Sequence, residues 1–547
     1  MLSLIYPRGE TGLKAISDTA CHDLGIDSLV KALSEDREEQ RIIYAYLSKM
    51  TADPYTAAYR SGVFNDIYRL PGLRESLTEL FGRIEYLSDY GMRAKNSGER
   101  LGIWYFLHRL DELNSYIQCV EAIRDQLIDA DIRSEGLIAL RDHISSIYDE
   151  KLFAEMKADI TALRAKTADI RSVTLGINLN DRFEAVSMGL VSVNSKPFKK
   201  SGVVSSFADA MAGDRISDTP EDTNDMRFHQ VYNMVDTDRS GHERLISRTM
   251  VRIADGDGMR NSTYQLNDTM NRMIDRLVKL LSETLAKYVN VAVMDIKAII
   301  PEFMFYIRAV DLIKAQRDKG RRCCTPVTGD IPMDAKGFYD MKLALNTDDD
   351  IVPNDLIFDK DHTVYILTGA NRGGKTTLTQ AVGLLYVMAQ AGLDVPADSF
   401  EYAPVDCIYT HFPADEDKTL DLGRLGEECV RFKEIWSECT SDSLILLNET
   451  FSTTSFEEGL YIAKDAVKAI ISRKVRTIYN THMHKLARDA DELSSPDCRA
   501  VSLVVRTEAG SRLYKAVIAP PEGSSYARDI AEKYGVTYED LVRGREQ

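Results

Sequence analysis

A glycine-rich loop in the second half of the chain carries the residue types best suited to bind phosphate. Residues 369–376 fit the pattern G-x-x-x-x-G-K-[ST], which closes here with Lys375 and Thr376. Glycines let backbone N–H groups converge on phosphate oxygens, and the N-terminus of a following helix adds a partial positive charge. Lys375 can reach the β- and γ-phosphates, and the Thr376 hydroxyl can bind Mg²⁺. The nucleotide-binding residues that we predict are Gly369, Ala370, Asn371, Arg372, Gly373, Gly374, Lys375, Thr376 and Thr377.

The segments on either side distinguish a phosphate loop from an ordinary glycine-rich turn. Residues 364–367 form a short apolar run that is typical of a buried strand. After the loop, apolar residues recur at helical spacing from Leu378 to Met388. A strand, a glycine loop and a helix in this order are the context in which the pattern binds phosphate. A glycine-rich turn that contains a lysine by chance would not need the strand before it or the helix after it.

A second apolar run, residues 443–447, ends in two polar residues that suit ATP hydrolysis, Asn448 and Glu449. P-loop ATPases normally carry an aspartate here that holds the Mg²⁺ shell, followed by a glutamate that polarises the attacking water. Asn448 keeps an oxygen but loses the charge, so we expect it to hold Mg²⁺ weakly beside Thr376. Glu449 remains available as the general base.

His482 follows a third predicted strand, residues 475–480. A histidine at this strand end can contact the γ-phosphate or the attacking water, as the switch histidines of ABC-type ATPases do. A lone histidine at a strand end is otherwise usually structural, but the phosphate loop upstream favours the functional interpretation. We therefore expect Lys375, Glu449 and His482 to be the catalytic residues.

Composition excludes several classes of protein. No run of 18 or more apolar residues is present, so we expect no membrane span and no membrane partner. The eight cysteines are scattered without a C-x-x-C pair, which argues for reduced thiols in a cytoplasmic protein and against a zinc site. The net charge of −17 excludes a generally basic surface. This charge does not exclude nucleic-acid binding, because such binding needs only a local basic patch.

The periodicity of apolar residues divides the chain into four parts. Residues 1–167 have helical spacing, and residues 168–250 open with period-two alternation that is typical of strands. Residues 251–322 return to helical spacing, and residues 323–547 alternate apolar runs with helical patterns. This last pattern predicts an α/β domain with a parallel sheet covered on both faces. Its predicted strands are 364–368, 407–412, 444–447 and 475–480, its helices 376–390, 427–438 and 457–472, and residues 501–505 and 513–517 an added hairpin.

These motifs together resemble the MutS family. The loop resembles the family's G-P-N-M-G-G-K-S-T, with Asn371 at the family's asparagine. Asn448 and Glu449 resemble the start of its D-E-x-x-R-G-T-S segment, and Thr481 with His482 matches its T-H. Further similarities are at residues 352–355 (V-P-N-D), 451–455, 523–527 and 535–536.

The resemblance implies a multidomain protein with a helical core and lever, an inserted β-containing clamp, and an α/β P-loop ABC-type ATPase domain. The family closes the lever and clamp around DNA, so residues 168–250 would be the clamp, with Lys196, Lys199 and Lys200 as DNA candidates. ATP and Mg²⁺ would lie between the subunits of a homodimer. The second subunit would supply Gly426 and Glu427, which align with the family's signature segment.

Two departures from the family pattern shape the functional hypothesis. The chain starts directly in the helical core, without the family's Phe-x-Glu mismatch wedge, and the signature serine is missing. We therefore expect an ATP-dependent protein of DNA repair or recombination that binds duplex or branched DNA, with a junction favoured over a mispair. The alternative is an ATP-dependent protein-interaction switch that does not bind DNA, which the acidic composition favours. An SMC-like ATPase is excluded because the helices that flank the insertion are too short.

Overall fold

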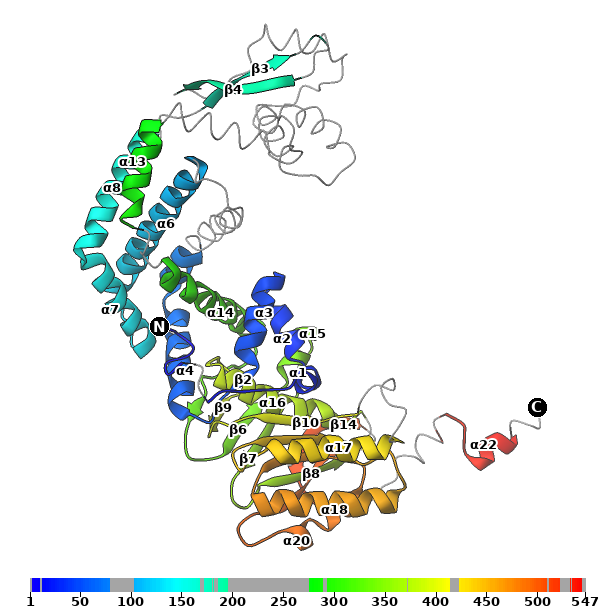
Figure 1. Ribbon diagram of the computed structural model, residues 1–547. Helices are drawn as coiled ribbons and strands as arrows, with labels where there is room; N and C mark the ends of the chain where they lie inside the picture. The colour runs from blue at the N-terminus through cyan, green and yellow to red at the C-terminus, as the bar shows by residue number, and fades with distance from the viewer. Residues whose placement is uncertain are drawn as a thin grey trace. The chain divides into compact units, whose positions relative to one another are not determined.

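The computed structural model describes most of the chain and divides it into two compact units (Figure 1). One unit comprises Met1–Glu75, Leu127–Asp142 and Met294–Gln547, and the other comprises Ser76–Gln126 and His143–Val293. The four-part division at residues 167, 250 and 322 stays a prediction, and the compact units follow different boundaries. The described residues are 2–9, 12–78, 103–167, 172–179, 181, 185–194, 275–288, 293–370, 372–413, 423–508, 511–521, 532 and 534–543.

A six-stranded sheet forms the centre of the first unit, in the order β10-β11-β12-β8-β13-β14. The first five strands are parallel, and β14 pairs antiparallel with β13 at the edge. A helical N-terminal region followed by an α/β domain is thus confirmed, and the predicted hairpin belongs to the main sheet. The strands are β8 Val364–Gly369, β10 Ile408–His411, β11 Leu444–Asn448, β12 Arg476–Asn480, β13 Ala500–Glu508 and β14 Ser511–Ile518.

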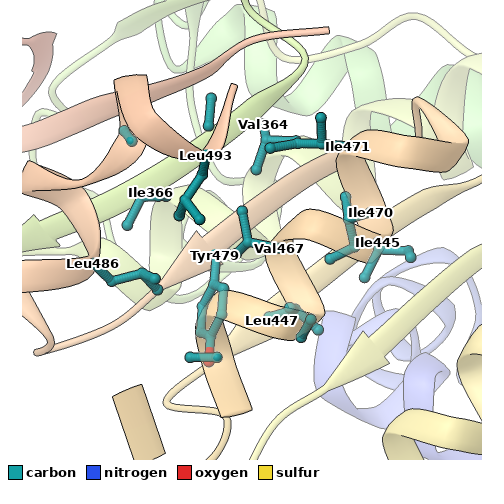
Figure 2. Packing of buried hydrophobic residues seen from close by; sticks show 14 of the residues in the cluster. Val364, Ile366, Ile445, Leu447, Val467, Ile470, Ile471, Tyr479, Leu486 and Leu493 are labelled. Carbon is teal, nitrogen blue, oxygen red and sulfur yellow. The ribbon is translucent and has the colours of Figure 1, made fainter. Parts of the chain in front are cut away.

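Helices cover both faces of this sheet, which is why β8 and β11 are mainly apolar. On one face α18 packs Val467, Ile470 and Ile471 against Ile445 and Leu447 of β11 (Figure 2). On the other face lies α16, which follows the phosphate loop and contacts β8, β11 and β12. The helices of this domain are α16 Lys375–Gln390, α17 Gly423–Glu438, α18 Phe456–Arg473, α19 His484–Arg488, α20 Ala490–Leu493 and α22 Tyr538–Arg543.

The first unit contains a second sheet of four strands, in the order β5-β9-β6-β7. In the sequence, β5, β6 and β7 come before the nucleotide-binding strand β8, and β9 comes after it. Asn354 ties it to the main sheet, because its side chain accepts a hydrogen bond from Ala516 N (2.8 Å) and donates one to Tyr514 O (3.1 Å). Asn354 belongs to the V-P-N-D segment, which therefore has a structural role. The elements are β5 Val327–Thr328, β6 Met333–Phe338, α15 Met341–Asn346, β7 Asn354–Phe358 and β9 Ser399–Tyr402.

The N-terminal 75 residues belong to the same compact unit as the sheet. Helix α1 contacts both α16 and β10, and α4 contacts α16. At Gly392 (φ 85°), just after α16, a Cβ would lie 2.5 Å from the backbone of Arg60, so α4 passes directly against this turn. The elements are β1 Lys14–Ala15, α1 Asp18–Leu24, α2 Ile26–Leu33, α3 Arg37–Leu47, β2 Lys49–Met50, α4 Pro54–Arg69 and, later in the chain, α14 Val293–Asp318.

Arg60 of α4 is fully buried and joins three parts of this unit. Its Nε donates to Ile5 O (2.8 Å), and its Nη1 donates to Gln390 O at the end of α16 (2.8 Å). The last carbonyls of a helix lack partners within the helix, so the guanidinium satisfies one of them and complements the helix dipole. Burial lowers the pKa of Arg60.

The second unit is built from long helices and one hairpin. The helices Ile103–Ile128 and Glu135–Asp149 belong partly to each unit, because Leu127–Asp142 is part of the first. The apolar stripe from Phe106 to Leu127 and the stripe that begins at Leu137 are buried, as expected of packed helices. The alternating segments form an antiparallel hairpin. The rest of the expected clamp, with Lys196, Lys199 and Lys200, lies outside the described residues. The elements are α6 Ile103–Ile128, α7 Glu135–Asp149, α8 Lys151–Thr167, β3 Ser172–Leu179, β4 Ala185–Asn194 and α13 Asp275–Ala286. No helix within the described ranges has the length and apolar character to cross a membrane.

Replacing Arg60 with alanine should destabilise the first unit strongly. The change leaves the carbonyls of Ile5 and Gln390 unpaired in a buried site, so we expect the free energy of unfolding to fall by about 2–4 kcal/mol. Chemical denaturation followed by circular dichroism measures the loss.

Arg41→Ala is the matched control, because Arg41 is exposed and pairs only with Glu38 on the surface among its described contacts. A surface change of this kind should cost less than about 0.5 kcal/mol. Equal losses for the two variants would contradict the bridging role of Arg60.

Candidate functional site

Three neighbouring parallel strands end at the same edge of the main sheet. In the sheet register Asn448 of β11 lies beside Asn480 of β12, which lies beside Leu367 of β8. Beyond the strand ends, Glu449 N donates to Asn480 O, and Thr481 N donates to Leu367 O (2.9 Å each). The hydrogen-bonded register therefore brings together the phosphate loop, the pair at 448–449 and the segment that contains His482.

The phosphate loop connects β8 to α16 through backbone conformations that favour glycine. Gly369 has φ 144°, and a Cβ there would lie 3.1 Å from Val505 O of β13; Gly374 has φ 89°. Lys375 begins α16, and its buried Nζ donates to Gly369 O (3.0 Å) and Ala370 O (3.3 Å). Burial lowers the pKa of Lys375, whereas the nearby Glu449 charge raises it. Asn371 lies outside the described residues.

The side chains of Thr376, Asn448 and Asn480 lie within hydrogen-bond distance of one another at the base of the phosphate loop. Thr376 Oγ1 donates to Asn448 Oδ1 (3.3 Å). Asn480 adds a third side chain, whose Nδ2 donates to Asn448 Oδ1 and also lies 3.4 Å from Thr376 Oγ1. Sequence reasoning missed Asn480; the available signal was a polar residue ending an apolar run beside Asn448.

Glu449 and His482 form the second polar pair of the site. His482 Nε2 lies 3.0 Å from Glu449 Oε1, with the glutamate side chain mostly buried and the histidine 48% exposed. Glu449 has φ 54°, a left-handed conformation that a non-glycine residue adopts at a cost in free energy. The structure therefore holds the carboxylate next to His482 through an unfavourable backbone conformation.

A cavity of about 620 Å³ lies over these groups. Its volume is in the range of small-molecule sites. The loop, Glu449 and His482 line part of it, and Ile351 and Val352 of the V-P-N-D region line another part together with Tyr514. The cavity lining is Phe338, Tyr339, Asp340, Leu343, Thr347, Asp349, Asp350, Ile351, Val352, Asn354, Arg372, Gly373, Gly374, Lys375, Thr376, Thr377, Leu378, Ala381, Glu449, His482, Val505 and Tyr514.

The expected signature residues lie away from this cavity. Gly426 and Glu427 are in the first turns of α17, and neither is among the described residues that line the cavity. Gly423 begins the helix with φ 66°. Within one chain, therefore, the structure does not bring Gly426 and Glu427 to the phosphate loop.

His411, at the end of β10, connects α17 to the loop that follows Glu449. It is buried, and burial lowers its pKa to about 4, so the ring is neutral at pH 7. Its Nε2 lies 3.1 Å from Glu428 O, and its Nδ1 lies 3.1 Å from Thr450 Oγ1. Because a carbonyl only accepts hydrogen bonds, Nε2 carries the proton and Nδ1 accepts from the threonine. Sequence reasoning missed this residue, which no motif marks.

Two models of known protein families match this chain, each over a different region. Residues 365–545 match MutS domain V, and residues 52–318 match the MutS2 N-terminal domain. "Endonuclease MutS2" from Bacillus velezensis is 27% identical over 284 residues, which are 51% of this chain and 34% of the relative. "Endonuclease MutS2" from Thermus thermophilus is 29% identical over 274 residues, 49% of this chain and 34% of the relative. "DNA mismatch repair protein MutS" from Methanothrix thermoacetophila is 35% identical over 198 residues, 36% of this chain and 22% of the relative.

The matches thus span about a third or less of the length of these relatives. MutS domain V is an ABC-type P-loop ATPase domain, which implies that this part of the chain binds ATP. The resemblance seen in the sequence motifs is confirmed: the chain belongs to the MutS family and combines a MutS2 N-terminal domain with a MutS domain V ATPase.

Proposed function

We propose that this protein is a MutS-like ATPase that binds DNA and hydrolyses ATP between two copies of the chain, coupling hydrolysis to clamp movement in DNA repair or recombination. One observation carries the proposal: the phosphate loop, Glu449 and His482 line the same cavity. The triphosphate would lie against the loop N–H groups and the N-terminus of α16. Lys375 would exchange its hydrogen bonds to Gly369 O and Ala370 O for phosphate oxygens.

The residues behind the loop fit Mg²⁺. This ion takes oxygen ligands, keeps several waters and usually binds through few protein groups together with substrate phosphates. Thr376 Oγ1 and Asn448 Oδ1 supply neutral oxygens that already lie 3.3 Å apart. When bound, Mg²⁺ would supply positive charge that offsets the charge developing on the triphosphate. Without a carboxylate at position 448, the protein would hold the ion mainly through oxygen dipoles.

Glu449 and His482 would handle the attacking water. The carboxylate would accept the proton of the water, because it lies at the cavity wall within the reach expected of a general base. His482 Nε2, which lies 3.0 Å from the same carboxylate, would hold that carboxylate in place or contact the γ-phosphate. The left-handed backbone at Glu449 supports this assignment, since such strain is often found at functional sites.

A second copy of the chain would complete the site. Gly426 and Glu427 lie outside the cavity of their own chain, and the start of α17 offers backbone N–H groups and the positive end of a helix dipole. These groups would contact the γ-phosphate bound by the partner. The proposed levers, residues 1–167 and 251–322, would transmit closure of the ATPase pair to residues 168–250.

The matched regions support a role on DNA, because the relatives include proteins named for mismatch repair and as endonucleases. Lys196, Lys199 and Lys200 remain the proposed DNA contacts, with branched DNA favoured over a mispair. The net charge of −17 favours the second candidate, an ATP-dependent protein-interaction switch without DNA binding. Salt-dependent DNA binding separates the two candidates.

Glu449→Gln should bind ATP as tightly as the parent and hydrolyse it at least about tenfold more slowly, because a positioned general base contributes about 10²–10⁴-fold. Lys375→Ala should instead lose nucleotide binding, because the charge that opposes the triphosphate is removed. Binding of a fluorescent ATP analogue and phosphate release measure the two effects separately. Glu492→Gln, an exposed residue of α20, controls for loss of one negative charge. Unchanged turnover in Glu449→Gln would exclude Glu449 as the base.

Mixed dimers test whether the site is shared between subunits. Gly426→Asp should place a negative charge near the partner's γ-phosphate, and Lys375→Ala should empty the variant's own nucleotide site. Each variant alone should therefore be nearly inactive. A mixed dimer has one site with an intact loop and an intact α17, so mixing the two variants should restore part of the ATPase rate. The absence of any recovery, with mixing verified by differently tagged chains, would contradict the shared site.

Titration of DNA tests the clamp assignment. We expect a four-way junction to bind more tightly than a homoduplex, a G·T mispair to add little, and binding to fall steeply with salt. Replacing Lys196, Lys199 and Lys200 with glutamine should weaken binding and flatten the salt dependence. Glutamine at the exposed Lys31, Lys360 and Lys468 gives the same change in net charge and should have little effect. Selective binding to the G·T duplex would contradict the preference for branched DNA, and no salt-sensitive binding would favour the protein-interaction switch.

A further inference from the structure

Asn448 and Asn480 form an amide pair at the end of neighbouring strands. They are paired in the register of β11 and β12, and their side chains are buried, with 8% and 1% exposed. Asn480 Nδ2 donates to Asn448 Oδ1 and to Thr376 Oγ1, and the Thr376 hydroxyl donates to Asn448 Oδ1. Three side chains therefore form a closed ring of hydrogen bonds at the base of the phosphate loop.

Counting donors and acceptors shows that the orientations of the two amides in this ring are coupled. Asn480 uses both of its amide N–H donors, and both acceptor positions of Asn448 Oδ1 are filled. Asn480 Oδ1, in contrast, is buried with no hydrogen-bond partner among the described residues. A buried acceptor without a partner costs free energy. In this orientation Asn480 leaves its oxygen unpaired and uses its nitrogen for the hydrogen bonds to Asn448 and Thr376.

The orientation matters because an amide has two unlike ends. An aspartate presents an oxygen to a cation whichever way it turns, whereas an asparagine presents either an oxygen or an N–H donor that repels the cation. If the Asn448 amide were reversed, its Nδ2 would face Asn480 Nδ2, and two donors would meet. With its nitrogen turned toward Asn448, Asn480 therefore favours the orientation in which Asn448 directs its oxygen toward the Thr376 hydroxyl.

We propose that Asn480 is a positioning residue for the metal end of the nucleotide site, which makes Asn448 an effective substitute for a carboxylate by fixing its amide orientation. The inference rests on the proposed function, in which Thr376 and Asn448 serve Mg²⁺. Asn480 itself does not contact nucleotide or metal in this role, and it acts through Asn448. Its effect should therefore depend on position 448 being an amide.

This dependence can be tested, because changes at position 480 should alter the Mg²⁺ requirement differently when position 448 is an asparagine and when it is an aspartate. The readout is binding of a fluorescent ATP analogue across a Mg²⁺ titration, and again in EDTA. The variants are Asn480→Ala, the nearly isosteric Asn480→Leu, Asn448→Asp, and Asn448→Asp combined with each change at 480. Asn65→Ala, in α4 and remote from the cavity, is the matched asparagine control. Thermal unfolding of each variant reports on folding.

We expect Asn480→Ala and Asn480→Leu to raise the Mg²⁺ concentration for half-maximal binding about two- to tenfold, which corresponds to the loss of one hydrogen bond. Binding in EDTA should be unchanged. Asn448→Asp alone should lower the Mg²⁺ requirement. In the Asn448→Asp background the changes at 480 should leave the requirement unchanged or lower it further, because a carboxylate needs no orienting and gains basicity when a donor is removed.

Two results would overturn the proposal. One is an equal rise in the Mg²⁺ requirement in both backgrounds, and the other is an equal loss of binding with and without Mg²⁺, which would show a purely structural role. A parent protein that binds no nucleotide under any condition would instead contradict the proposed function. The two kinds of failure are therefore distinguishable. Because leucine keeps the branched shape of the Asn480 side chain and alanine leaves a cavity, thermal unfolding of the two variants separates loss of the hydrogen bonds from loss of packing.

Discussion

The parallel register of β8, β11 and β12 is the constraint on which the site depends. Hydrogen bonds between parallel strands fix which residues lie side by side, and all their carboxyl ends meet at one edge. The same register that buries Val364 and Ile445 in the core therefore sets Asn448 beside Asn480 and brings Glu449 close to the phosphate loop. A shift by one residue would turn Asn448 toward the opposite face of the sheet.

The N-terminal helices stabilise this edge of the sheet by packing against α16. Helix α16 carries Lys375 at its start, and Arg60 bonds the carbonyl of Gln390 at its other end. In the middle of α16, a Cβ at Gly383 would collide with Leu24 of α1, so the two helices pack closely. Residues far apart in the sequence thus fix the helix whose N-terminus is expected to face the phosphates.

Sequence alone indicated the main sheet well, for a physical reason. Strands buried on both faces are continuous apolar runs, so 364–367 and 444–447 are easily recognised, and the glycines of the loop mark the turn between strand and helix. The four-stranded sheet was missed because its strands are short, as at Val327–Thr328 and Ser399–Tyr402, and each offers few residues in which a pattern can be recognised. Asn480 was missed because its role exists only in the pairing of β11 with β12, which sequence spacing does not show.

The connection between α17 and the catalytic edge is equally invisible in the sequence and consists of defined hydrogen bonds. His411 is neutral, so it can donate to Glu428 O of α17 and accept from Thr450 at once. Thr450 directly follows Glu449, and Tyr479 of β12 donates to its carbonyl (2.7 Å). Any movement of α17 toward a partner would therefore act on the residue next to Glu449 through the hydrogen bonds of this buried histidine.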